Sequence, residues 1–62
     1  MSLNEQYSKQ EDSIRKSLNL LESKINSHRV DFNNNPDNWG YVADLVHIEK
    51  SLKDIIDFIR TK

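Results

Sequence analysis

Two series of mostly apolar residues, each repeating at alternating intervals of four and three, run along most of the chain. The first series, over residues 7–32, lies on one face of a helix, because an α-helix completes a turn every 3.6 residues. The other faces are rich in serine and asparagine, which have low helix propensity, so this helix should depend on packing. We therefore predict a helix over about residues 4–33. Its series consists of Tyr7, Glu11, Ile14, Leu18, Leu21, Ile25, His28 and Phe32.

The second series has no polar interruption and predicts the stronger helix, over about residues 36–60. It consists of Tyr41, Leu45, Ile48, Leu52, Ile55 and Ile59. We refer to the two series together as the seam. Four further apolar residues lie beside the second series, which widens the apolar face of this helix beyond what one partner helix covers. They are Val42, Val46, Ile56 and Phe58.

The segment between the two series, about residues 33–36, should turn the chain. An asparagine at the end of the first helix can take the left-handed conformation that ends a helix. Asn35 can cap the second helix, and Pro36 suits its first turn, where no amide hydrogen is needed. Asp37 then places a negative charge near the positive end of the helix dipole. A start of the second helix at Asp37 or Asn38 is an alternative.

A turn this short predicts an antiparallel helical hairpin, a single all-α domain over residues 1–62. With the turn centred on Asn34 and Asn35, Leu18 is expected opposite Leu52, and His28 opposite Tyr41.

The aromatic residues near the turn have two interpretations. In the first, Trp39 covers the last turn of the first helix, and Gly40 removes a side chain where the two helices come closest. In the second, Trp39, Tyr41 and Phe32 form a ligand pocket. The first is favoured, because ligand pockets usually contain more converging polar groups than one turn can offer.

The size of the chain predicts self-association. A domain of about 60 residues buries only ~60% of the surface that its unfolded chain exposes, and the 62 residues include no cysteine for a disulfide. The economical solution is a homodimer of two hairpins, a coiled-coil-like four-helix bundle with two-fold symmetry. Val42, Val46, Ile56 and Phe58 are the candidate partner face. Glu49 and Lys53 lie on the same side, where they either fix the orientation of the partner or mark the rim of the interface.

No constellation of residues predicts catalysis, a cofactor or a metal site. Asp44, His47 and His28 form a conceivable trio of metal ligands, but His47 is expected to point away from the seam. His28 occupies a seam position, where a histidine is more often hydrogen-bonded, here to Asp44 or to the Tyr41 hydroxyl. We therefore expect a non-enzymatic protein.

Nucleic-acid binding is the alternative function. Small dimeric four-helix bundles such as the plasmid regulator ROP bind RNA, and the first helix carries a set of basic residues. These are Lys9, Arg15, Lys16, Lys24 and Arg29. Acidic residues lie between them, and nine Lys and Arg against ten Asp and Glu give a net charge of −1. Since nucleic-acid binders usually present a basic patch, this composition disfavours the alternative.

Membrane insertion and export are not predicted. No apolar run approaches the ~18 residues of a membrane span, and the N-terminus lacks a signal-peptide pattern. The absence of cysteine is compatible with a reducing cytoplasm. We expect a cytoplasmic protein.

Residues 35–42, Asn-Pro-Asp-Asn-Trp-Gly-Tyr-Val, followed by Asp44-Leu45 and by Ile48 and Leu52, carry a resemblance. This stretch resembles the second half of short uncharacterised phage-encoded proteins, including those of cyanophages, that share an N-P-x-N-W-G-Y-V motif. The resemblance implies a viral or viral-derived accessory protein. For a viral protein we expect action in the host cytoplasm and contact with a host protein. It implies no catalytic residue.

Replacing Leu52 with alanine should test the seam. Truncating a leucine in a packed helix interface costs about 2 to 5 kcal/mol, through lost apolar burial and the cavity left behind. We expect a lower thermal midpoint and dissociation of the assembly. Unchanged melting, followed by circular dichroism, would mean that the seam is assigned wrongly.

Overall fold

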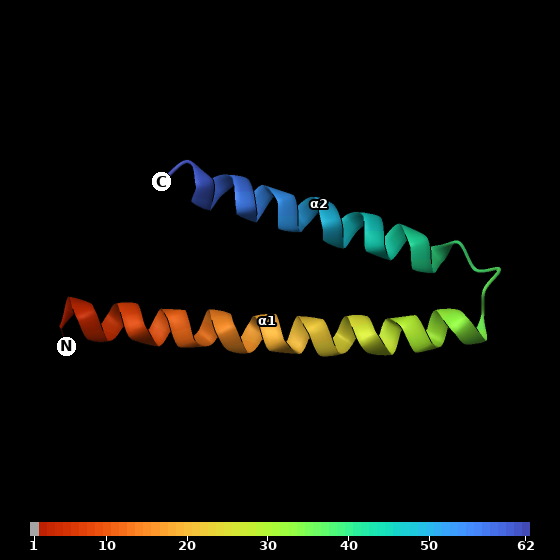
Figure 1. Cartoon of the computed structure of the whole chain (residues 1–62), viewed down its shortest axis with the longest axis horizontal. Helices are drawn as coiled ribbons and strands as arrows, with labels where there is room; N and C mark the ends of the chain where they lie inside the picture. The colour runs from red at the N-terminus through yellow and green to blue at the C-terminus, as the bar shows by residue number, and fades with distance from the viewer. Residues whose placement is uncertain (1) are drawn as a thin grey trace. The chain divides into compact units, whose positions relative to one another are not determined.

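The protein is all-α, as the sequence predicts. The computed structural model describes residues 2–62, and Met1 lies outside the described residues. Helix α1 comprises Leu3–Asn34 and helix α2 comprises Gly40–Arg60, with residues 35–39 between them (Figure 1). No strand occurs in residues 2–62.

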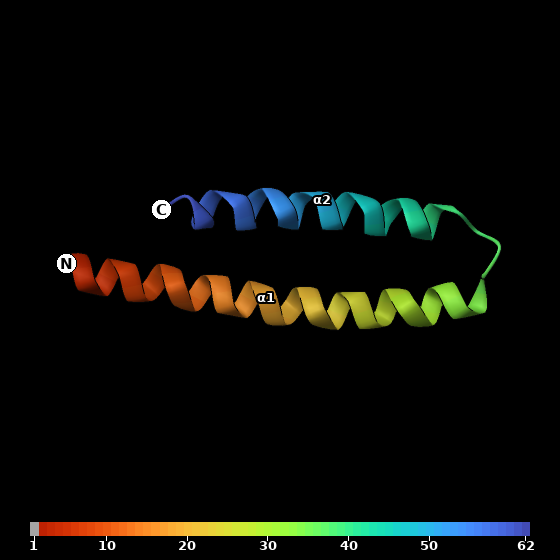
Figure 2. The same cartoon turned by 45° about the horizontal axis from the view of Figure 1, so that its top comes forward.

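The chain divides into two compact units. The first ends at Asp31, and the second, Phe32–Lys62, contains the last residues of α1, the turn and α2. Helix α1 continues through this boundary as one unbroken ribbon in both views (Figures 1 and 2). The single domain and the antiparallel packing of the two helices stay predictions.

Ser2 caps the start of α1. Its Oγ accepts a hydrogen bond from the Glu5 amide at 3.1 Å, and its carbonyl accepts one from the Gln6 amide at 3.2 Å. A serine followed three residues later by glutamate is the sequence signature of a helix start, and the Glu5 carboxylate lies near the positive end of the dipole. The predicted start near residue 4 overlooks this signature, and α1 begins at Leu3.

Pro36 determines where α1 ends. It has no amide hydrogen, and its ring would clash with the Phe32 carbonyl if the helix continued. That carbonyl instead accepts a shorter-range hydrogen bond from the Asn35 amide, at 2.9 Å. No residue among 2–62 has a positive φ. The expected left-handed asparagine is therefore wrong, because proline ends this helix without a left-handed residue.

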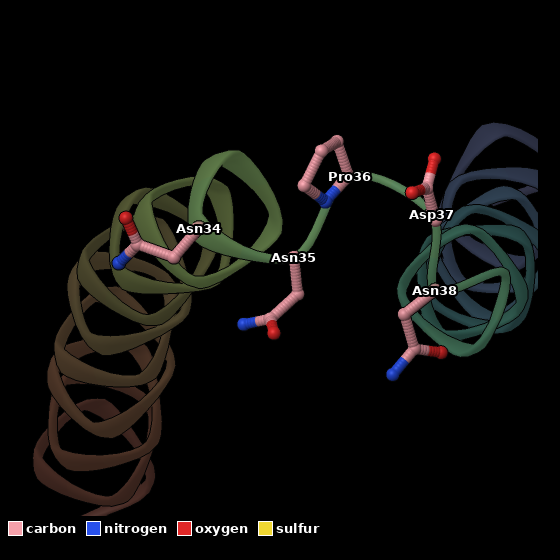
Figure 3. Close-up of a pocket in the computed structure, with 5 residues that line it drawn as sticks. All are labelled: Asn34, Asn35, Pro36, Asp37 and Asn38. Carbon is pink, nitrogen blue, oxygen red and sulfur yellow. The ribbon is translucent and has the colours of Figure 1, made fainter.

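Residues 35–38 form a hydrogen-bonded turn. The Asn38 amide donates to the Asn35 carbonyl at 3.1 Å, with Pro36 in the second position, where its fixed φ suits a turn. The side-chain amide groups of Asn35 and Asn38 lie on one side of the turn, and the Pro36 ring and the Asp37 carboxylate lie on the other (Figure 3).

The predicted start of the second helix near residue 36, with Asn35 as its cap, is wrong. Helix α2 begins at Gly40, four residues later. The reason is that the Asn35 carbonyl is engaged by Asn38 in the turn, so the chain completes this turn before a helix can start. Pro36 and Asp37 thus belong to the turn rather than to the first turn of α2.

Asn38, which precedes the N-cap residue Trp39, supplies the side-chain hydrogen bond at the start of α2, here called its cap. Its Oδ1 accepts a hydrogen bond from the Gly40 amide at 2.9 Å, which satisfies one of the amides that a helix start leaves unpaired. Trp39 occupies the N-cap position in a helical conformation, φ −67° and ψ −14°, without a side-chain cap bond of its own. The Asn38 and Trp39 carbonyls accept from the Tyr41 and Ala43 amides at 3.3 and 3.1 Å.

Gly40 makes room for this cap. A Cβ at Gly40 would lie 3.0 Å from Asn38 Oδ1 and 3.9 Å from Asn38 Cγ. The expected role of Gly40 in a close approach of the two helices stays a prediction.

At its other end, α2 stops at Arg60. The Thr61 hydroxyl donates to the Phe58 carbonyl at 2.9 Å, and the Lys62 ammonium lies 4.9 Å from the centre of the Phe58 ring. Cations here interact favourably with the negative end of the helix dipole.

Replacing Asn38 with alanine should destabilise the start of α2 by about 1 kcal/mol, the usual cost of losing a side-chain cap. The matched control is Asn33→Ala, which makes the same change in the last turn of α1, where alanine is the better helix former. Thermal denaturation should separate the two variants. Equal midpoints would show that the Asn38 cap contributes nothing.

Candidate interaction surface

No side chain in residues 2–62 is fully buried. The residues of intermediate exposure all occupy seam positions, and they are Glu11, Leu21, Ile25, His28, Phe32, Tyr41, Ile48 and Leu52. The remaining seam residues are more exposed, from 44% for Leu45 to 69% for Tyr7. Because residues 2–62 contain no buried side chain, most of their apolar side chains stay available to a partner.

Helix α2 presents two apolar stripes side by side. The first is its part of the seam. The second stripe, here called the flank, lies one residue further along at every position, which is a rotation of about 100° around the helix. It consists of Val42, Val46, Glu49, Lys53, Ile56 and Arg60.

The flank is apolar on both sides of a central ion pair. Val42, Val46 and Ile56 are 39%, 61% and 51% exposed. Between them, the Lys53 ammonium lies 3.2 Å from a Glu49 carboxylate oxygen, with both side chains about 70% exposed. Glu49 and Lys53, four residues apart with the acid first, have the favourable order for such a pair.

Phe58 does not belong to the flank. Its position on the helix is about 120° or more from Val42, Val46 and Ile56, on the other side of the seam. It is 64% exposed and carries the Lys62 ammonium over its ring. The four residues predicted as a partner face therefore do not share one stripe of α2, and the partner face itself stays a prediction.

Tyr41, rather than Trp39, packs against Phe32. The two rings meet edge to face, with centroids 6.4 Å apart and planes at 81°, an arrangement that aromatic rings prefer. Trp39 is 80% exposed. The expectation that its indole covers the end of α1 is wrong, because the later start of α2 leaves Trp39 in the turn and brings Tyr41 to Phe32.

An open concavity of about 390 Å³ lies beside the turn (Figure 3). It is lined by Asn34, Asn35, Pro36, Asp37 and Asn38. Phe32, Trp39 and Tyr41 do not line this concavity, so it differs from the aromatic pocket considered as the alternative.

The surface of α1 is polar and carries both signs of charge. Arg15 donates to Glu11 at 3.3 Å, an ion pair between residues four apart. The basic residues of α1 are spread around the helix, since Arg15 and Lys24 are separated by about 180° around its axis. The sequence also places acidic residues between these basic ones, so the basic residues of α1 do not form a single stripe.

Metal ions and membranes are two further kinds of binding partner. No group of three His, Cys, Asp or Glu side chains placed to hold a metal ion is found among residues 2–62. Neither helix within this range has the length and apolar character needed to cross a membrane.

The comparisons with known proteins give no relative. The sequence matches no protein-family model, and neither the curated proteins nor the solved structures yield a match.

A double-mutant cycle should measure the ring contact. We expect Phe32→Leu and Tyr41→Leu to be coupled by about 0.5 to 1.5 kcal/mol, the usual value for an edge-to-face pair. Trp39→Ala should change the free energy of unfolding by less than about 0.5 kcal/mol, because exposed side chains contribute little. Denaturant unfolding gives these values, and additive effects of the two leucine substitutions would contradict the contact.

Proposed function

We propose that the chain is a non-enzymatic helical interaction protein that self-associates, two hairpins forming a four-helix bundle. The observation that carries this proposal is the pair of adjacent stripes on α2. A helix with apolar residues on two faces about 100° apart needs two neighbours, because one partner helix covers one face. Helices of four-helix bundles have this environment.

The two series of the seam support the hairpin. If the contact between Phe32 and Tyr41 sets the register, the residue numbers of every opposing pair add up to 73. The remaining pairs are then Ile14 with Ile59, Leu18 with Ile55, Leu21 with Leu52, Ile25 with Ile48 and His28 with Leu45. Every seam position of α2 thus has a seam partner in α1.

This register differs by about one helical turn from the one expected from the sequence. The expected register has its turn centred on Asn34 and Asn35, whereas the turn is centred on Asp37. A longer turn moves each partner on α2 by three or four residues, which is one step of the repeat. Because the seam repeats at that interval, both registers bring apolar residues together.

A viral role is part of the proposal. It rests on the resemblance of the Asn-Pro-Asp-Asn-Trp-Gly-Tyr-Val stretch to phage-encoded proteins, and a host protein is the second partner that this role implies. Trp39 lies within that stretch and is 80% exposed. Exposed tryptophan is enriched in binding interfaces, so we place the contact with the host protein at the turn.

Sedimentation equilibrium should find a dimer at micromolar concentration. The RNA-binding alternative predicts, in addition, retention on immobilised RNA that weakens as salt is raised, because phosphate contacts release counterions. We expect no such retention from a chain of net charge −1 with dispersed basic residues. A cooperatively melting monomer would end the proposal, and salt-sensitive retention on RNA would favour the alternative.

A further inference from the structure

The flank of α2 has a charge pattern with a definite symmetry. Its ion pair lies at the middle of the stripe, with Glu49 two residues before Ser51 and Lys53 two residues after it. Val46 and Ile56 lie five residues to either side of Ser51. Reversing the direction of the helix about Ser51 therefore exchanges Glu49 with Lys53 and Val46 with Ile56, and it places Val42 opposite Arg60 at the ends of the stripe.

This symmetry determines how the flank meets a copy of itself. In an antiparallel arrangement about Ser51, each Glu49 faces Lys53 of the second copy, and each Val46 faces Ile56. In a parallel arrangement, Glu49 would face Glu49 and Lys53 would face Lys53, and like charges directly opposite each other are unfavourable. Only the antiparallel arrangement pairs opposite charges.

We propose that two copies of the chain pack through the flank of α2, antiparallel, around a two-fold axis at the level of Ser51. This interface rests on the proposed self-association and specifies its surface and orientation. A two-fold interface brings the same patch of both subunits together, so a self-complementary stripe is the feature it requires.

The ion pair has a second role in this arrangement. Within one helix, Lys53 lies 3.2 Å from Glu49, with both side chains exposed. Across the two-fold axis the same groups form two pairs between the helices, flanked on either side by apolar residues. Charges at the edge of a helix interface set partner choice and orientation more than they add affinity. The Glu49 and Lys53 pairs thus favour the antiparallel over the parallel dimer.

The opposite side of α2 lacks this pattern. The stripe one residue before the seam carries Asp44, His47, Ser51, Asp54 and Phe58. Reversing it about Ser51 places Asp44 opposite Phe58 and His47 near Asp54, and no apolar residues meet. The flank is therefore the face of α2 that a second copy fits.

Charge-reversal variants test the interface. Glu49→Lys and Lys53→Glu each place like charges opposite each other twice in the homodimer, and we expect the dissociation constant to rise about tenfold at low salt. Equimolar mixing of the two variants should restore wild-type affinity, because the heterodimer pairs lysine with glutamate at both positions. Sedimentation equilibrium measures all three samples.

Mixing the two variants separates the effect of the substitutions on the interface from their effect on the stability of the helix. Each single variant also loses the ion pair within its own helix, and mixing cannot restore that pair. The control is Asp54→Lys, which changes the net charge as Glu49→Lys does but lies on the opposite side of α2, and it should dimerise like the wild type. High salt should reduce the difference between Glu49→Lys and the wild type.

Cysteine cross-linking tests the orientation, since the chain has no cysteine of its own. A mixture of Val46→Cys and Ile56→Cys should form the mixed disulfide in preference to either symmetric one, because only opposing positions bring the Cβ atoms close enough. Symmetric Val46→Cys disulfides in preference would indicate a parallel dimer and overturn the proposal.

These outcomes distinguish a failure of the proposed interface from a failure of the proposed function. If the wild type dimerises but Glu49→Lys has no effect, or mixing restores nothing, the copies meet through another face and self-association stands. If the wild type is a monomer, both fail.

Discussion

Two helices cannot enclose a side chain. A single neighbouring helix covers a side chain from one direction only, and no residue among 2–62 is fully buried. The hydrophobic effect is proportional to the apolar area removed from water, which makes further burial in a partner the main available source of stability. The flank of α2 is the surface on which we propose that this further burial occurs.

The turn shows how a few polar groups position the apolar ones. Pro36 ends α1. The Asn35 carbonyl accepts a hydrogen bond from the Asn38 backbone amide, and the Asn38 side-chain oxygen accepts one from the Gly40 backbone amide. This chain of hydrogen bonds delays α2 until residue 40 and thereby determines which ring reaches Phe32. An edge-to-face contact between Phe32 and Tyr41, instead of coverage by Trp39, is the result. The exposed indole is then available to a partner.

The position of the charges on α2 matters more than the free energy that their interaction contributes. An exposed pair such as Glu49 with Lys53 contributes little to the stability of one helix. Its place at the centre of an apolar stripe makes it informative about orientation, because its reversal symmetry matches an antiparallel copy. The charges of α1 lack a comparable order, since its basic residues point in several directions and acids lie between them. Self-association through α2 therefore has a clearer physical basis than recognition of phosphate.

The sequence by itself determined the all-α class and the two helices, because a repeat of four and three over many residues is compatible only with a helix. It also determined the composition of both apolar stripes and the ion pair at residues 49 and 53. Only the tertiary structure decided where the turn lies, which asparagine caps α2, that Gly40 accommodates that cap and that Tyr41 packs on Phe32. The reason is that Asn35 and Asn38 have equal intrinsic ability to cap a helix. The choice between them depends on hydrogen bonds and ring contacts among residues 32–41, which a periodic pattern does not contain.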